Sequence, residues 1–250
     1  MSQRPKVSRE LVFQEAAANQ PNVTGVIMPK LKIFDCGFPG TSTLYGWSST
    51  TGANGLTLAH ASLDGGAMTL TCGATAADCG ELYHTAQWSP YFNCGMEAKL
   101  KVSGITNICI AVGFVDAYCN ANDHVGLELS GATQYDNTAT VSDNCGMTFD
   151  TAASTAYWYY SALENDVVRA PVAAVGSLAP VADTYFRVRV QTDTNGNVWF
   201  YYNGVPVGHM PLYVASAVTD LLTPYIGIIS RDTDSWVATV SRITTWQDCS

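Results

Sequence analysis

The stretch from Asp183 to Trp246 constrains the fold more than any other part of the sequence. Over residues 185–191 apolar side chains alternate with polar ones, which is the period of a strand with one buried face. Two Asn-Gly pairs follow, at 195–196 and 203–204, and Asn-Gly supplies the positive φ angles that tight hairpins need. Two further apolar runs close the chain. The stretch therefore predicts consecutive antiparallel strands.

The order of these motifs resembles the concanavalin A-like lectin/glucanase superfamily, and more narrowly its versions in structural proteins of tailed phages. The resemblance rests on the strand, the N-G-N turn, an aromatic strand, N-G-V-P-V-G, L-T-P-Y-I-G-I and S-R-I-T-T-W-Q. It covers residues from about 84 to 248. The resemblance implies an all-β jelly roll, in which two antiparallel sheets pack face to face.

Earlier segments also show strand patterns. Residues 108–115 form a continuous apolar run, which predicts a central strand covered on both faces, with residues 125–129 as its hairpin partner. The other strands are expected at 30–36, 56–60, 67–71, 147–149 and 156–160. Residues 90–104 show a further alternation, with Met96, Ala98, Leu100 and Val102 on one side.

Length and composition favour one large domain over residues 31–250. The chain has 250 residues, of which 47% are hydrophobic and 13% charged, so it has ample material for a core. Its net charge of -9 argues against a nucleic-acid partner. No apolar run is long enough to span a membrane, and no signal peptide follows Met1. We therefore expect synthesis in a host cytoplasm and no membrane partner.

Residues 1–30 have a different character and are predicted to form an extended N-terminal arm. Residues 1–32 carry five basic and two acidic side chains, which leaves seven basic and 19 acidic side chains in the rest. The arm is expected to order on a neighbouring subunit, while a frayed terminus is the alternative. Its predicted contact residues are Arg4, Lys6, Arg9, Leu11, Val12 and Phe13.

The eight cysteines do not by themselves predict a disulfide framework. The chain lacks a targeting signal and is large enough to fold without staples. Cys109 lies in an apolar run and is expected to be a buried, unreactive thiol. Cys72 and Cys79 are the pair most suited to form a bridge in an oxidising medium. No C-x-x-C motif supports a zinc site.

The resemblance to glucanases raises glycoside hydrolysis, which requires two carboxylates about 5 Å apart in retaining enzymes. In those glucanases the carboxylates come from an E-x-D-x-x-E-like run on one strand, and this sequence has no such run. Glu97 shares its strand face with lysines, Glu128 stands alone, and Asp232 and Asp234 fall in a predicted turn. The four histidines are scattered. We expect no catalytic residue and no enzymatic activity.

Two features leave ligand alternatives open. Trp158 and Tyr160 are candidates for stacking on a sugar ring, although burial by neighbouring chains explains such aromatic strands as well. The loop from Asp116 to Asp123 is rich in oxygen ligands for Ca²⁺, but turn-forming residues explain it equally well. We expect neither a metal nor a cofactor.

The leading hypothesis is a non-enzymatic virion protein, a capsid decoration or head-fibre subunit attached through its arm. Its partners would be the major capsid protein or another virion protein, and copies of itself in a homo-oligomer. A carbohydrate-binding adhesion module for host surface glycans and a glucanase-type glycoside hydrolase are the alternatives. The fold alone does not separate these functions.

Overall fold

The computed structural model describes residues 31–38, 46–51, 56–61, 66–117, 126–129, 141–153, 155–164, 167–193, 196–210 and 221–248. Residues 1–30, with all six predicted contact residues of the arm, lie outside this description. So does most of the predicted calcium loop. The described chain is all-β and forms two antiparallel sheets, which confirms the predicted jelly-roll fold class.

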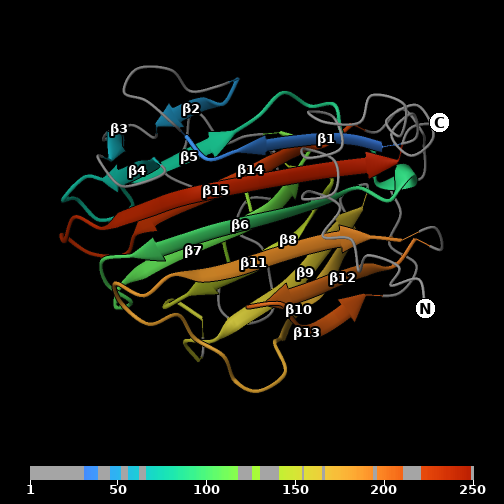
Figure 1. Ribbon diagram of the computed structural model, residues 1–250. Helices are drawn as coiled ribbons and strands as arrows, with labels where there is room; N and C mark the ends of the chain where they lie inside the picture. The colour runs from blue at the N-terminus through green and yellow to red at the C-terminus, as the bar shows by residue number, and fades with distance from the viewer. Residues whose placement is uncertain are drawn as a thin grey trace, which may run out of the picture.

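The first sheet, sheet A, has eight strands. Seven of them follow one another in the order β13 (Val205–Met210), β12 (Val198–Tyr202), β11 (Phe186–Thr192), β6 (Gly95–Val102), β15 (Val237–Asp248), β4 (Ala67–Cys72) and β3 (Leu56–Ala61). The eighth strand, β1 (Leu31–Cys36), pairs with β15. Figure 1 shows β1, β15, β6, β11, β12 and β13 following one another down the picture.

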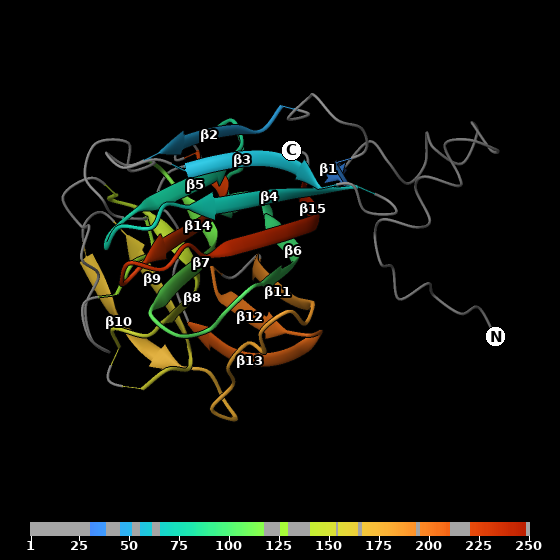
Figure 2. The ribbon, with the colours of Figure 1, turned by 90° about the vertical axis from the view of Figure 1, so that its left-hand side faces the viewer.

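The second sheet, sheet B, has seven strands. Their order is β10 (Val167–Ala173), β9 (Trp158–Glu164), β8 (Asn144–Asp150), β7 (Ile108–Val115), β14 (Thr223–Ser230), β5 (Cys79–Tyr83) and β2 (Ser48–Thr51). One 3-10 turn, Pro90–Phe92, precedes β6. Figure 2 shows the two layers, with β9 and β10 on one side and β12 and β13 on the other.

The hairpins predicted from the Asn-Gly pairs are confirmed. β11 pairs with β12 from Val188 opposite Tyr202 to Thr192 opposite Val198, and β12 pairs in turn with β13. At the second turn Asn203 and Gly204 have φ angles of 49° and 80°, the left-handed conformation that a two-residue hairpin of this kind requires. Local sequence is therefore enough to fix this corner of sheet A.

The longest strand, β15, joins distant parts of the chain. One edge of it pairs with β6, and the other pairs with β4 through residues 237–240 and with β1 through residues 243–248. A register shift between Val240 and Arg242 marks a β-bulge on the β6 side. The first described strand is thus hydrogen-bonded to the last, which ties the two ends of the described chain together.

The main core lies between the two sheets and is built from alternate residues of nearly every strand. On β6 the buried side chains are Met96, Ala98, Leu100 and Val102, the alternation predicted from the sequence. Aromatic residues at one end of the core pack against one another, with Trp158 5.7 Å from Phe186 and Tyr160 4.9 Å from Phe200 between ring centroids. Burial of this apolar surface is the main source of stability.

The prediction that residues 108–115 form a strand covered on both faces is confirmed. Every residue of β7 is buried. The prediction that residues 125–129 pair with it as a hairpin is wrong, because β7 pairs with β8 on one edge and β14 on the other. Residues 126–129 lie instead on the outer face of the sheet. The short apolar pattern of this segment fits pairing at a strand edge and packing against a sheet face equally well.

No disulfide joins Cys72 to Cys79, so this predicted bridge is absent from the structure. Cys72 lies in sheet A and faces the main core, whereas Cys79 lies in sheet B and belongs to a different apolar cluster. The six residues between them connect one sheet to the other, so the two cysteines are close in sequence but belong to different sheets. The predicted burial of Cys109 is confirmed.

We expect the buried thiols to make the free energy of unfolding fall at high pH. Burial raises the pKa of Cys94 from its ordinary 9.0 to about 12, and burial also raises the pKa of Cys109 and Cys145. Above pH 9 the unfolded thiol ionises first, so each buried thiol should lower the unfolding free energy by about 1.4 kcal/mol per pH unit. Below pH 9 the thiols are protonated in both states and have no such effect.

Urea unfolding between pH 8 and 11 measures this slope. Cys94→Ala should make the fall of the unfolding free energy with pH shallower by about 1.4 kcal/mol per pH unit, the contribution of one buried thiol, relative to the unmodified chain. An identical slope in both proteins would mean that Cys94 ionises in the folded state and is not buried.

Candidate functional site

The outer face of sheet B, the one turned away from sheet A, carries many of the buried polar side chains, including three carboxylates. Alternate residues of β5, β7, β8, β9 and β14 point to this face, since their neighbours fill the main core. A second apolar cluster lies on it, formed by residues of these strands together with Leu127, Leu129 and Val141. The face is therefore covered and not open to solvent.

Residues 126–129, here called the covering segment, are hydrogen-bonded to this face from end to end. The Gly126 N–H donates to the Tyr225 hydroxyl at 2.8 Å. The Thr148 hydroxyl donates to the Leu127 carbonyl at 2.7 Å. The Leu129 N–H points to Asp150 Oδ2 at 3.4 Å. The segment is thus anchored on β14 and β8.

Two glycines in the floor of the face allow this close packing. Gly113 of β7 and Gly146 of β8 stand opposite each other in the ladder. A Cβ atom on Gly146 would lie 2.5 Å from Leu127 Cδ1, and one on Gly113 would lie 2.3 Å from the Cys145 carbonyl oxygen. The lack of a side chain at Gly146 therefore leaves room for Leu127, and the lack of one at Gly113 lets β7 and β8 approach each other closely.

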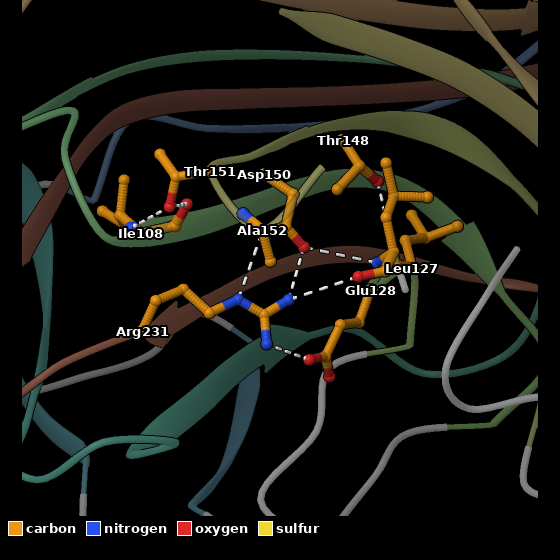
Figure 3. Close-up of polar contacts among 9 residues, drawn as sticks. Ile108, Leu127, Glu128, Thr148, Asp150, Thr151, Ala152 and Arg231 are labelled. Atoms are coloured by element: carbon orange, nitrogen blue, oxygen red, sulfur yellow. Dashed lines mark hydrogen bonds and ion pairs between the residues drawn. The ribbon is translucent and has the colours of Figure 1, made fainter. Parts of the chain in front are cut away.

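The covering segment is also held by an ion-pair cluster (Figure 3). Arg231, from the turn between β14 and β15, forms ion pairs with Glu128 through Nη1 and with Asp150 through Nη2. Its Nε donates to Asp150 Oδ1 at 3.1 Å, which makes the contact with Asp150 bidentate. The side chains of Glu128 and Asp150 are 1% and 0% exposed, and that of Arg231 is 19% exposed.

Asp150 is saturated with donors. Besides Arg231, it accepts the Ala152 N–H at 2.9 Å. The pKa of Arg231 is raised: burial lowers it, but the interactions with Cys109, with Asp150, to which it is also hydrogen-bonded, and with Glu128 more than offset burial. The guanidinium therefore stays charged at any pH that the protein meets, and both carboxylates keep their cation.

A third buried carboxylate, Glu81 of β5, lies on the same face. Its Oε1 accepts a hydrogen bond from the Tyr225 hydroxyl at 2.7 Å, and that hydroxyl also accepts the Gly126 N–H. Tyr225 thus links a carboxylate of the sheet to the first residue of the covering segment.

In this arrangement the carboxylates are buried inside the protein and are not exposed to a ligand in solvent. Glu81, Glu128 and Asp150 come from β5, the covering segment and β8, so they do not form a row on one strand. Glu128 and Asp150 share one guanidinium, and a substrate has no route to their oxygens while the covering segment is in place. General acid–base chemistry requires a group that can reach the substrate.

The residues predicted as glycan-stacking candidates lie elsewhere. Trp158 is 0% exposed and packs against Phe149 and Phe186 in the main core. Tyr160 is 8% exposed and stacks on Phe200. The prediction that these two rings stack on a sugar is wrong, because strand alternation turns both of them toward sheet A. The alternative, burial by neighbouring chains, does not describe these two rings either, because both are buried in the core of the subunit itself.

Other predicted features have plainer roles. Asp116, at the start of the predicted calcium loop, accepts the Ser142 hydroxyl at 2.6 Å. Asp232 and Asp234 lie in the turn between β14 and β15, as predicted. Within the part of the chain that the structure describes, no group of three or more potential ligands could hold a metal ion, and no helix is both long and apolar enough to cross a membrane.

Sequence reasoning missed Arg231 and Asp150. Arg231 is one of only seven basic residues after residue 32, and it stands in a predicted turn between two buried strands. Because basic residues are rare in this part of the chain, an arginine between two buried strands was the one sequence signal that could have indicated a buried ion pair. Its partners lie 81 and 103 positions away in sequence, so nothing local could identify them.

No protein-family model matches the chain, and no curated protein matches its sequence. Solved structures nevertheless share its fold. The carbohydrate recognition domain of Emp47p superposes with a TM-score of 0.58 at 13% identity, over 88% of this chain and 98% of that one. Peanut lectin superposes with a TM-score of 0.57 at 12% identity, over 88% of this chain and 99% of that one. The Bacillus licheniformis β-glucanase superposes with a TM-score of 0.57 at 14% identity, over 85% of this chain and 97% of that one. The chain therefore has the jelly-roll fold of the concanavalin A-like lectins and glucanases.

We expect Arg231→Met to destabilise the protein strongly. Removal of the cation leaves two buried carboxylates without their partner, and breaking a buried ion pair in this way costs about 3–5 kcal/mol. Chemical denaturation at pH 7 measures the loss.

The triple variant Arg231→Met, Glu128→Gln, Asp150→Asn serves as the matched control. It removes all three charges with little change in shape, so it should recover much of the lost stability. If the triple variant is no more stable than Arg231→Met alone, packing of the arginine stem and not charge pairing holds the covering segment.

Proposed function

We propose that this chain is a non-enzymatic structural subunit of a phage particle, a capsid decoration or head-fibre protein. The observation that carries the non-enzymatic part is the closed outer face of sheet B. Its carboxylates are held by Arg231 and Tyr225 under the chain's own covering segment. A glycoside hydrolase needs two carboxylates that flank the bond it cleaves. A structural subunit has no such need and is stabilised by burying the face.

The placement on a virion is supported by sequence features. The motifs from the N-G-N turn to S-R-I-T-T-W-Q resemble phage structural proteins, and they form β11 to β15 here. A chain of low charge with an oppositely charged N-terminal arm suits a subunit that packs against neighbours. Its partners would be the major capsid protein or another virion protein, together with copies of itself.

Carbohydrate binding is the second candidate, and one observation favours it. Peanut lectin and the carbohydrate recognition domain of Emp47p share the fold over nearly their whole lengths. On this chain a glycan site would have to lie away from the region that residues 126–129 cover. The β-glucanase of the same fold keeps hydrolysis as a third candidate.

The purified protein should release no reducing sugar from lichenan or laminarin, because its buried carboxylates are paired and covered. A reducing-end assay with a glucanase as positive control measures this. Release that disappears in both Glu128→Gln and Glu81→Gln, with the fold retained by circular dichroism, would contradict the proposal.

Deletion of residues 1–30 should leave the β circular-dichroism signal and the thermal midpoint almost unchanged, because β1 begins at Leu31. Binding to purified particles, measured by co-sedimentation, should be lost. The matched full-length variant Arg4→Gln, Lys6→Gln, Arg9→Gln should weaken binding only partly, because exposed ion pairs contribute about 0–1 kcal/mol each and Leu11, Val12 and Phe13 remain. Undiminished binding by the truncated protein would place the attachment surface on the jelly roll.

A further inference from the structure

The basic residues of the domain are concentrated on one surface. Only seven lysines and arginines follow residue 32, against 19 acidic residues. Five of the seven lie on β6, β11 and β15, three neighbouring strands of sheet A. They are Lys99, Lys101, Arg187, Arg189 and Arg242.

Strand alternation turns these side chains outward. Their neighbours Ala98, Leu100, Val188 and Ile243 are buried in the main core, so the basic residues beside them face away from sheet B. The Arg187 and Arg242 side chains are 55% and 45% exposed. We call Lys99, Lys101, Arg187 and Arg189 the basic face, with Arg242 at its edge.

The pairing register places like charges side by side. Arg187 of β11 stands directly opposite Lys99 of β6, and Arg242 of β15 stands opposite the same lysine from the other side. Three cations therefore form one row across three strands, which lie about 4.8 Å apart. Like charges in directly opposed positions destabilise a sheet. An anionic partner would remove this repulsion.

The carboxylates on this face do not neutralise it. Glu97 is shared by Arg187, at 3.1 Å, and Arg189, at 3.5 Å. Asp35 of β1 forms a bidentate pair with Arg242 at 2.6 and 2.8 Å. Lys99 and Lys101 form no ion pair with any residue that the structure describes. The four residues of the basic face and Glu97 together carry a net charge of +3.

Aromatic rings beneath the cations hold them in position. Lys99 and Lys101 lie over the Tyr185 ring, with Nζ at 4.9 and 5.6 Å from its centroid. Arg189 lies over the Tyr201 ring at 4.4 Å. These cation–π contacts reduce the side-chain freedom that binding would otherwise have to remove.

From this geometry we infer that the basic face binds a linear acidic polysaccharide, through the carboxylate or sulfate groups of its repeating units. A straight row of cations on an open sheet face fits a polymer whose charges recur at regular intervals. Lysine and arginine side chains recognise such groups, and arginine does so through two parallel hydrogen bonds.

A nucleic acid fits this face less well. Single-stranded binding relies on exposed rings on which bases stack, and the rings of Tyr185 and Tyr201 already carry cations. The rest of the domain is strongly acidic and would repel a polymer as densely charged as DNA.

The test measures binding of the full-length protein to polygalacturonate, a carboxylate polymer, and to heparin, a sulfated one. Dextran is the neutral control and oligo-dT the nucleic-acid control. Titration calorimetry should show binding to at least one acidic polysaccharide that weakens as NaCl rises, and the preferred polymer distinguishes carboxylate from sulfate recognition. No binding to either polymer, or tighter binding to oligo-dT, would overturn the inference.

The variant Lys99→Gln, Arg187→Gln should weaken the affinity by roughly tenfold, the value of two exposed ion pairs. If it folds poorly, Lys101→Gln, Arg189→Gln tests the same face. Arg169→Gln, on β10 of sheet B, should leave the affinity unchanged. The arm variant Arg4→Gln, Lys6→Gln, Arg9→Gln should have a smaller effect than Lys99→Gln, Arg187→Gln. Equal losses for every variant would indicate unspecific attraction and overturn the inference.

Discussion

Two carboxylates buried on the outer face of sheet B require a cation, and Arg231 supplies it. A buried charge without a partner is so costly that a chain either pairs it or neutralises it. Here the single guanidinium joins β8, the covering segment and the turn between β14 and β15. The closed state of this face depends on that junction, because each carboxylate comes from a different segment.

The covering of the outer face of sheet B by residues 126–129 limits which functions of this fold are open to the chain. Lectins and glucanases share this architecture, so the fold by itself allows sugar binding, hydrolysis or a structural task. In this chain Gly146 of β8 leaves room for Leu127 at the floor of the sheet, and Tyr225 ties Glu81 to the same segment. The space where a ligand would meet these carboxylates is therefore filled by the protein itself.

The two sheets divide the charge of the domain between them. Sheet B buries acidic side chains on its outer face, whereas sheet A displays most of the few basic ones on its own outer face. Bulk composition conceals this division, since the chain as a whole has a net charge of -9. A negative net charge argues against a large basic surface of the kind that binds nucleic acid. It does not argue against a small local cluster of basic residues.

The sequence by itself determined what depends on short-range order. Alternation predicted the buried faces of β6 and β11, and Asn203-Gly204 predicted its hairpin, because backbone conformation and strand period are local properties. The tertiary structure alone decided what depends on register and packing. It turned Trp158 into the core, set residues 126–129 on a face and not an edge, and brought Arg231 to Asp150. These outcomes follow from which strands become neighbours, and contacts between residues a hundred positions apart leave no periodic trace in the sequence.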